Sequence, residues 1–318
     1  MSSINMKALK IFPILFVMNK AGAVDVTQET SAKIAPALGA EIFLSDDSEG
    51  FQTHKLSAEF FPKFEDANQY LGIRASAYQY KIDNWDIDGQ KVSLIAKDVD
   101  PLTTNGWYVD AGFFNQGNHG LFTFDGSYRT NVADQTAVEV FANRDWVETK
   151  PALDNGTHFT FVGLSADQSI GRHVTLVGLA GSQFFSDDNR RDHGRLKVIY
   201  QPSLDLGLTL QGRYRTYHSQ KEDVNRVYFN PKNYEEAMFA IGWRKRFSGW
   251  TTGLTAGVGR EKINNDPSQN TRLIEISAQS PLNRSQYLNF SAGYNRSASY
   301  YGADYNYRYI KGEWILRF

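Results

Sequence analysis

The feature of this sequence that most restricts its fold is a two-residue alternation of apolar and polar side chains, repeated along almost the whole chain. In the C-terminal stretch YIKGEWILRF, Ile310, Trp314 and Phe318 fall on one side. Lys311 and Glu313 fall on the other side. A period of two residues is that of an extended strand whose faces meet different surroundings. The apolar face could meet either a protein core or lipid.

Sixteen alternating segments follow one another from Leu38 onward, separated by clusters of Gly, Asn, Asp, Pro or Ser that favour turns. We expect strands at 38–46, 52–63, 69–81, 90–98, 105–115, 119–130, 135–147, 157–166, 172–184, 191–201, 206–218, 234–247, 250–262, 271–280, 285–297 and 303–318. Bacterial single-chain outer-membrane barrels have an even number of strands. The predicted fold is therefore all-β, a transmembrane antiparallel up-and-down barrel of about sixteen strands.

Charged residues fall consistently on one face of the predicted strands. In segment 206–218, for example, Leu208 and Leu210 would face lipid, whereas Arg213 and Arg215 would face inward. A charge near the lipid midplane costs about 2–4 kcal/mol, so the charged face must line a watery lumen. A soluble sandwich with a polar exterior remains the alternative. It does not account for the alternation together with the chain's N-terminus, loop lengths and terminal aromatic residue.

The bulk composition excludes several classes of protein. Mean hydropathy is −0.46, a value typical of soluble proteins, but a barrel exposes only alternate residues to lipid and so has low average hydropathy. The formal net charge is −1, without the basic excess of a nucleic-acid-binding protein. The sequence has no cysteine, which excludes disulfides, thiolate metal sites and a cysteine nucleophile.

The N-terminus has the pattern of a secretory signal peptide. Lys7 and Lys10 precede the apolar run IFPILFVM, and Ala21-Gly22-Ala23 follows it as a cleavage site. The run is far shorter than the roughly 20 residues that a membrane-spanning helix needs. We therefore predict a signal peptide at 1–23, a periplasmic lead-in at 24–36 and a barrel at 37–318. The predicted location is the bacterial outer membrane, reached by signal-peptide-dependent secretion.

Connector lengths suggest the orientation of the barrel. With the N-terminus in the periplasm, the outward connectors are 47–51, 82–89, 116–118, 148–156, 185–190, 219–233, 263–270 and 298–302. The inward connectors are 64–68, 99–104, 131–134, 167–171, 202–205, 248–249 and 281–284. Apart from 116–118 the outward set is longer, as expected for external loops. Both termini are thus predicted to be periplasmic. Lipid and lipopolysaccharide would surround the barrel, and the terminal Phe318 resembles the signal that the barrel assembly machinery binds.

The last 90 or so residues carry a family resemblance. A Tyr-Phe-x-Pro stretch (Tyr228, Phe229, Pro231) lies in a long late loop, a Gly-rich strand (250–262) follows, and a Tyr-Gly-rich hairpin precedes the terminal strand. In this order they resemble the C-terminal barrels of synthase-dependent exopolysaccharide exporters, which secrete poly-N-acetylglucosamine and cellulose. The resemblance implies a barrel of that type. Those exporters carry a helical repeat domain that this chain lacks, so a separate periplasmic partner is implied.

Function is predicted from the lumen and this resemblance. Inward tyrosines could stack on sugar rings, and inward charges could bind hydroxyl groups. The candidates are Tyr78, Tyr80, Tyr108, Arg213, Arg215, Tyr217, Glu236, Arg244, Arg246, Tyr309 and Glu313. The plainer interpretation is a ladder of ion pairs that stiffens the wall, and the Tyr228 motif could simply pack a loop onto the rim. We predict an exopolysaccharide export channel; a passive diffusion porin and a structural or adhesive barrel are the alternatives.

Enzymatic chemistry is not indicated. The six histidines are scattered, without metal-ligand spacing, and no Gly-rich phosphate loop is present. Asp187, Asp188, Asp192 and His193 resemble the acid and His set of barrel proteases, but adjacent residues of a strand point to opposite faces. A general porin would fold a long third external loop into its lumen, whereas here that connector is 116–118. We predict a non-enzyme with no cofactor, no metal and no nucleic-acid partner.

Overall fold

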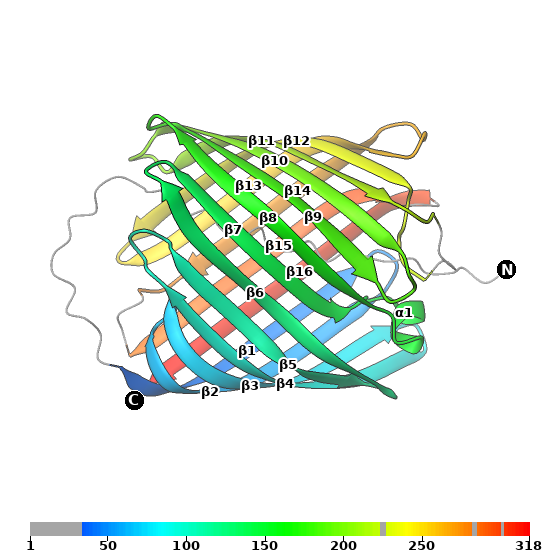
Figure 1. Cartoon of the computed structure of the whole chain (residues 1–318), viewed down its shortest axis with the longest axis horizontal. Coiled ribbons are helices and arrows are strands. Elements are labelled where there is room, and N and C mark those ends of the chain that lie inside the picture. Colours follow the sequence, from blue (N-terminus) through cyan, green and yellow to red (C-terminus); the bar gives the residue numbers. More distant parts are fainter. Residues whose placement is uncertain (1–33, 223–226, 282–284, 300–301) are drawn as a thin grey trace.

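Sixteen antiparallel strands close into one barrel in the computed structural model of the chain, which describes residues 34–222, 227–281, 285–299 and 302–318 (Figure 1). Each strand pairs with its neighbours in sequence, and the first pairs with the last. The strands are β1 (Ala35–Asp47), β2 (Gln52–Asp66), β3 (Gln69–Ile82), β4 (Trp85–Val99), β5 (Gly106–Gln116), β6 (His119–Ala133), β7 (Thr136–Trp146), β8 (His158–Ile170), β9 (Val174–Phe185), β10 (Arg190–Ser203), β11 (Leu208–Ser219), β12 (Asn233–Phe247), β13 (Trp250–Ile263), β14 (Gln269–Gln279), β15 (Gln286–Ser299) and β16 (Gly302–Arg317). The predicted signal peptide and most of the predicted lead-in lie outside the described residues.

The pairing of β1 with β16 closes the barrel. Its register runs without interruption from Ala37 opposite Arg317 to Asp47 opposite Tyr307. A closed ladder leaves no strand edge with unpaired backbone groups, which is the condition for a sheet to stand in hydrocarbon. The predicted all-β barrel of sixteen strands is confirmed. Within the described residues, no helix has both the length and the apolar character needed to cross a bilayer.

The strand boundaries differ from the prediction mainly at one connector. The predicted connector 82–89 is wrong: the turn is only Asp83-Asn84, and Ile82 pairs directly with Trp85. Asp83 has φ 50°, a left-handed conformation that Asp tolerates in tight turns. The polar residues that suggested a loop belong to β4, which forms a hairpin with β3. At the start of the barrel, β1 begins at Ala35, two residues before the predicted boundary at residue 37.

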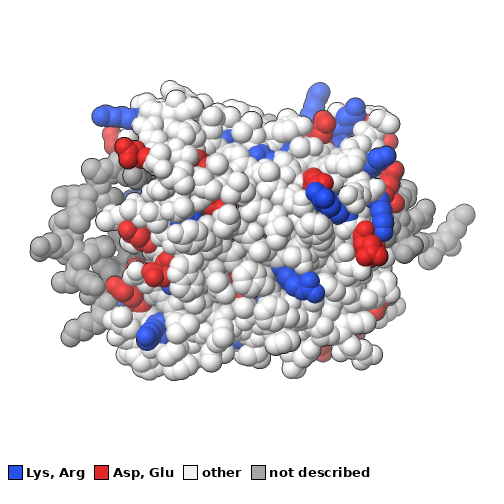
Figure 2. All heavy atoms as spheres, viewed as in Figure 1, with Lys and Arg blue, Asp and Glu red and all other residues white. Residues whose placement is uncertain are grey.

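The outer surface of the barrel is apolar. In Figure 2, Lys, Arg, Asp and Glu gather mainly towards the two ends of the face in view, with largely uncharged residues between them. Large apolar side chains are exposed on all parts of the wall, including Leu38, Ile42, Leu56, Val92, Leu94, Phe113, Val140, Leu164, Leu196, Phe239, Ile241, Val258, Ile274 and Ile310. Exposed aromatic residues lie near the end that carries the C-terminus: Trp107, Tyr200, Phe247, Trp314 and Phe318. The alternation of the sequence is therefore a true inside-outside division.

On the inner face, aromatic rings lie flat against the wall over glycines. A Cβ atom built on Gly293 would be 2.4 Å from the ring of Tyr309, its partner across β15 and β16. A Cβ atom on Gly163 would likewise be 2.4 Å from the ring of Phe141. These glycines are required because any side chain would lift the neighbouring ring off the sheet.

We expect Gly293→Ala to lower the free energy of unfolding by about 1–3 kcal/mol, the usual cost of overpacking. The measurement is urea unfolding in detergent micelles, followed by tryptophan fluorescence. Gly212→Ala in β11 is the control, because nothing lies within 4 Å of its Cβ position. Equal urea midpoints for the two variants would show that the ring is not held over Gly293.

Candidate functional site in the barrel lumen

The residues predicted to line the lumen all occupy positions on the inner face of their strands. They alternate with the exposed apolar side chains of the outer face. They are Tyr78 and Tyr80 on β3, Tyr108 on β5, Arg213, Arg215 and Tyr217 on β11, Glu236, Arg244 and Arg246 on β12, and Tyr309 and Glu313 on β16. Their orientation agrees with the prediction. Their contact with a transported molecule stays a prediction.

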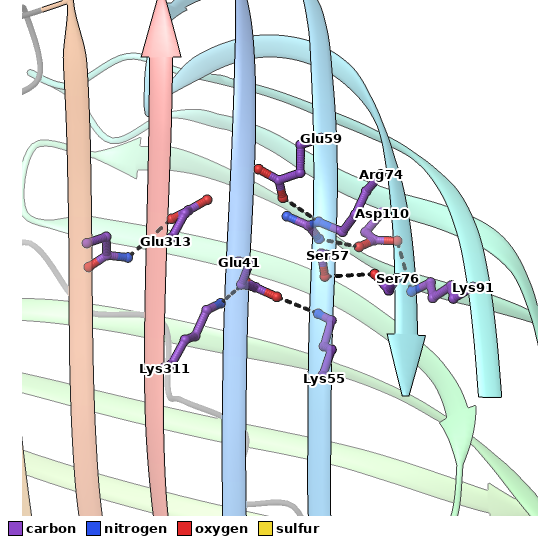
Figure 3. Close-up of polar contacts among 11 residues, drawn as sticks. Glu41, Lys55, Ser57, Glu59, Arg74, Ser76, Lys91, Asp110, Lys311 and Glu313 are labelled. Atoms are coloured by element: carbon purple, nitrogen blue, oxygen red, sulfur yellow. Dashed lines mark hydrogen bonds and ion pairs between the residues drawn. The ribbon is translucent and has the colours of Figure 1, made fainter. Parts of the chain in front are cut away.

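One part of the inner wall is a network of ion pairs centred on Glu41 of β1. The Nζ atom of Lys55 lies 2.6 Å from one carboxylate oxygen, and that of Lys311 lies 2.7 Å from the other. Figure 3 shows the two lysines reaching Glu41 from β2 and β16, the strands on either side of β1. The carboxylate is 2 % exposed, and each of its two oxygens is bound by a lysine ammonium group, so the buried charge is fully paired. The contact between Glu41 and Lys311 crosses the seam between β1 and β16 that closes the barrel.

A second network extends the first around β2 to β5. Arg74 donates to Glu59 at 2.6 Å and to Asp110 at 2.8 Å. Lys91 lies 3.0 Å from the other oxygen of Asp110 (Figure 3). One arginine therefore joins carboxylates of two strands that are not neighbours. This part of the wall is a ladder of ion pairs.

The wall formed by β10 and β11 has a different charge pattern. Arg195 lies directly opposite Arg215, and Lys197 lies directly opposite Arg213. Arg215 has a carboxylate partner, Glu236, at 2.5 Å. Like charges directly opposite one another across two strands are destabilising. Arg195 and Lys197 are both missing from the predicted binding residues of the lumen, although the two-residue period of segment 191–201 places them on one face.

Several predicted tyrosines are packed against other side chains. Tyr80 is 0 % exposed and belongs to a cluster at the end of the barrel opposite the C-terminus. Tyr78 packs against Phe114, with ring centroids 4.4 Å apart. Tyr217 is stacked on Tyr234 with an interplanar angle of 6°. As placed, the ring of Tyr80 has no surface for a sugar to stack on.

The end of the barrel opposite the C-terminus is partly covered by the connector between β7 and β8. This connector, predicted as a loop at 148–156, contains the one-turn helix α1 (Lys150–Asp154), at the right in Figure 1. Thr149 caps the helix by accepting from the backbone N–H of Ala152 at 3.0 Å. Gln116 of β5 donates to the carbonyl of Leu153 at 2.8 Å. Leu153 is fully buried, so the helix is packed into the barrel mouth.

The connector between β11 and β12 covers the same end. The ring of Tyr228 stacks on Phe185 of β9 at 4.4 Å and 12°, and its hydroxyl donates to Asp187 and accepts from Asn189. Burial raises the pKa of Tyr228, so this hydroxyl stays protonated at neutral pH. Thr149 also donates to the carbonyl of Val227 at 2.6 Å, which joins the two connectors.

Arg191 of β10 anchors this connector from within the barrel. Its guanidinium group donates to Ser219 at 3.2 Å, to the carbonyl of Phe229 at 2.7 Å and to Asn230 at 3.0 Å. It also lies 4.6 Å from the ring centroid of Tyr217. Arg191 is 0 % exposed. The motif residues Tyr228, Phe229 and Pro231 thus pack the connector onto the inner rim, one of the two interpretations that the sequence left open.

Residues that suggested hydrolytic chemistry are separated by the strand geometry. Asp192 lies on the outer face, where it accepts from Ser182 at 2.5 Å. His193 lies on the inner face between the rings of Phe161 and Tyr217. Within the described part of the chain, no group of three or more His, Cys, Asp or Glu side chains is arranged to hold a metal ion.

The fold is similar to that of a solved bacterial polysaccharide outer membrane secretin, with a TM-score of 0.68 and 14% identity over 89% of this chain and 98% of that chain. Weaker similarities, with TM-scores of 0.45 and 0.41, link 90% of the chain to OccK5 (OpdH) of Pseudomonas aeruginosa and to the outer membrane channel DcaP of Acinetobacter baumannii, at 9% and 8% identity over 98% and 96% of those chains. No protein-family model and no curated protein matches the sequence. The first similarity shows the fold.

We expect Arg74→Met to lower the free energy of unfolding by about 3–5 kcal/mol, because it leaves buried carboxylates without their shared cation. Arg213→Met is the matched control, since among the residues that the structure describes Arg213 bonds only to the neutral Gln211, and it faces Lys197. Its cost should be about 1 kcal/mol or less, because relief of repulsion offsets the lost hydrogen bond. Urea unfolding in lipid vesicles measures both variants. Similar losses for the two would contradict the assignment of Arg74 to the structural network.

We expect Arg191→Met to release the connector between β11 and β12. Each hydrogen bond from a buried charged donor is worth about 1.5–3 kcal/mol, so trypsin should cleave after Lys221 and Lys232 at least about tenfold faster. Arg190→Met changes the neighbouring, outward-facing arginine and should leave cleavage unchanged. Mass spectrometry of the fragments reports both rates. Unchanged cleavage of the Arg191 variant would show that other contacts hold the connector.

Proposed function

We propose that this protein is an outer-membrane channel through which a polysaccharide leaves the cell. The observation that carries the proposal is the closed sixteen-strand wall with an apolar outer face and a charged inner face. A barrel of about sixteen strands is wide enough to enclose an aqueous channel. The fold shared with a polysaccharide secretin supports a sugar polymer as cargo. The Tyr-Phe-x-Pro resemblance to exopolysaccharide exporters points the same way.

The orientation that we propose places both termini in the periplasm. The two longest connectors, 147–157 and 220–232, then lie at the external end, together with helix α1. The C-terminal residue Phe318 lies at the opposite end, is 65% exposed, and is available to the barrel assembly machinery. The charges at both ends of the barrel would contact lipopolysaccharide and lipid head groups. A separate periplasmic protein would deliver the polymer.

A diffusion porin for small solutes is the second candidate function. Helix α1 and the described residues 227–232 of the sixth connector pack against the inner wall and narrow the external mouth. A pore that selects solutes by size would use such a narrowing. The third external connector, Gly117-Asn118, is too short to form the constriction of a general porin. The narrowing comes instead from the fourth and sixth connectors.

The decisive experiment is planar-bilayer conductance of the mature protein with oligosaccharides added to one side. The export channel should show stepwise conductance that long oligosaccharides block reversibly and that monosaccharides leave unchanged. A pore that passes small ions and ignores every oligosaccharide would favour the porin. Absence of conductance, with the barrel folded by its heat-dependent gel shift, would contradict both and favour a structural or adhesive role.

A further inference from the structure

We propose that the inner wall formed by β10 and β11 binds anionic groups, so that the cargo is an acidic saccharide chain carrying carboxylates. The site consists of Arg195, Lys197 and Arg213, referred to below as the cationic track. It deepens the channel function proposed above and rests on it.

Charge is distributed unevenly around the lumen. The described inner positions of β9 to β12 hold a single carboxylate, Glu236. The cations on those positions are Arg191, Arg195, Lys197, Arg213, Arg215, Arg244 and Arg246. On β16 and β1 to β5 the two signs are interspersed and joined in ion pairs. The excess of positive charge is therefore confined to one side of the channel.

The cationic track lacks partners of its own. Among the described residues, no hydrogen bond or ion pair is formed by the side chains of Arg195 and Lys197. Within the described part of the chain, Arg213 donates only to the neutral Gln211, at 2.7 Å. By contrast, every cation of the network around Glu41 and Asp110 has a carboxylate within 3.0 Å. Half-buried cations left unpaired and facing like charges are the arrangement that an anionic ligand would stabilise.

Carboxylates on neighbouring strands do not neutralise the track. Asp167 on β8 is bound by Arg129 at 2.6 Å, and Glu236 on β12 is bound by Arg215 at 2.5 Å. Glu275, on the inner face of β14, forms no ion pair with any described residue, and its charge acts on Lys197 and Arg213 only from beyond ion-pair distance. The three nearest acids are thus either occupied or placed on a more distant strand.

The spacing of the track suits a repeating ligand. Successive inward positions along a strand are about 6.6 Å apart, so the pairs Arg195–Arg215 and Lys197–Arg213 form consecutive rungs. Gln211 and Tyr217 flank these rungs along the same face of β11. Arginine binds a carboxylate through two parallel N–H donors, whereas a neutral sugar offers no charge. A chain with acidic sugars could therefore move from one rung to the next.

The first test is ion selectivity of the full mature protein in planar bilayers under a KCl gradient. The wild type should be anion-selective, and the triple variant Arg195→Gln, Lys197→Gln and Arg213→Gln should lose this selectivity. The control removes three cations from the outer face: Arg260→Gln, Lys262→Gln and Arg272→Gln. A wild-type pore without anion preference, or a control that changes selectivity as much as the triple variant, would overturn the inference while leaving the channel intact.

The second test measures binding directly and does not need an open pore. Fluorescence anisotropy of a labelled galacturonic acid hexamer is followed with the detergent-solubilised protein at low salt. The hexamer should bind the wild type and the outer-face control equally, and the triple variant at least about tenfold more weakly. A neutral cello-hexamer and a cationic glucosamine hexamer should bind more weakly than the acidic hexamer. Equal binding of the three sugars, or equal affinity of the triple variant, would reject the cationic track.

Absence of conductance combined with charge-dependent binding would contradict the channel and leave the anion site standing. Conductance that is blocked equally by neutral and acidic hexamers would support the channel and reject the cationic track. The two proposals therefore fail separately.

Discussion

The rest of the structure depends on the hydrogen-bonded pairing of β1 with β16, which turns a sheet into a closed wall. Without it, β1 and β16 would be edge strands and would expose backbone donors and acceptors to hydrocarbon, at a cost of several kcal/mol for each group. The seam is reinforced from inside by Glu41, which binds a lysine on each neighbouring strand. Closure also separates the two environments, so that alternate side chains of every strand meet lipid or lumen.

The inner wall combines two kinds of charge arrangement. Around Glu41 and Arg74, each buried ion has partners on adjacent strands, which makes this region a structural ladder (Figure 3). On β10 and β11 the cations face one another instead. Inward-facing Arg and Lys residues therefore differ in their surroundings: some are paired with carboxylates, and others face further cations. Identity and inward orientation alone do not distinguish a stiffening charge from one available to cargo.

The mouth opposite the C-terminus is formed by packing rather than by strand ends alone. Helix α1 and residues 227–232 of the connector between β11 and β12 bury apolar side chains against the inner faces of several strands and are joined through Thr149. Arg191, which is closed to water, holds this connector by donating to the carbonyl of Phe229 and to Asn230, and it also donates to Ser219 at the end of β11. A molecule that passes through this end of the lumen must therefore pass beside helix α1 and this connector.

The sequence by itself determined the strand number, the inward or outward face of each residue and most strand ends, because a period of two and its turn residues are local properties. It could not determine that Asp83-Asn84 forms a tight turn, since the polar residues of β4 resemble a loop until their register with β3 is known. Nor could it distinguish Arg74, which is paired with two carboxylates, from Arg213, which has no carboxylate partner among the described residues. Both are inward arginines in alternating strands, and only closure and register decide which carboxylate, if any, comes within reach.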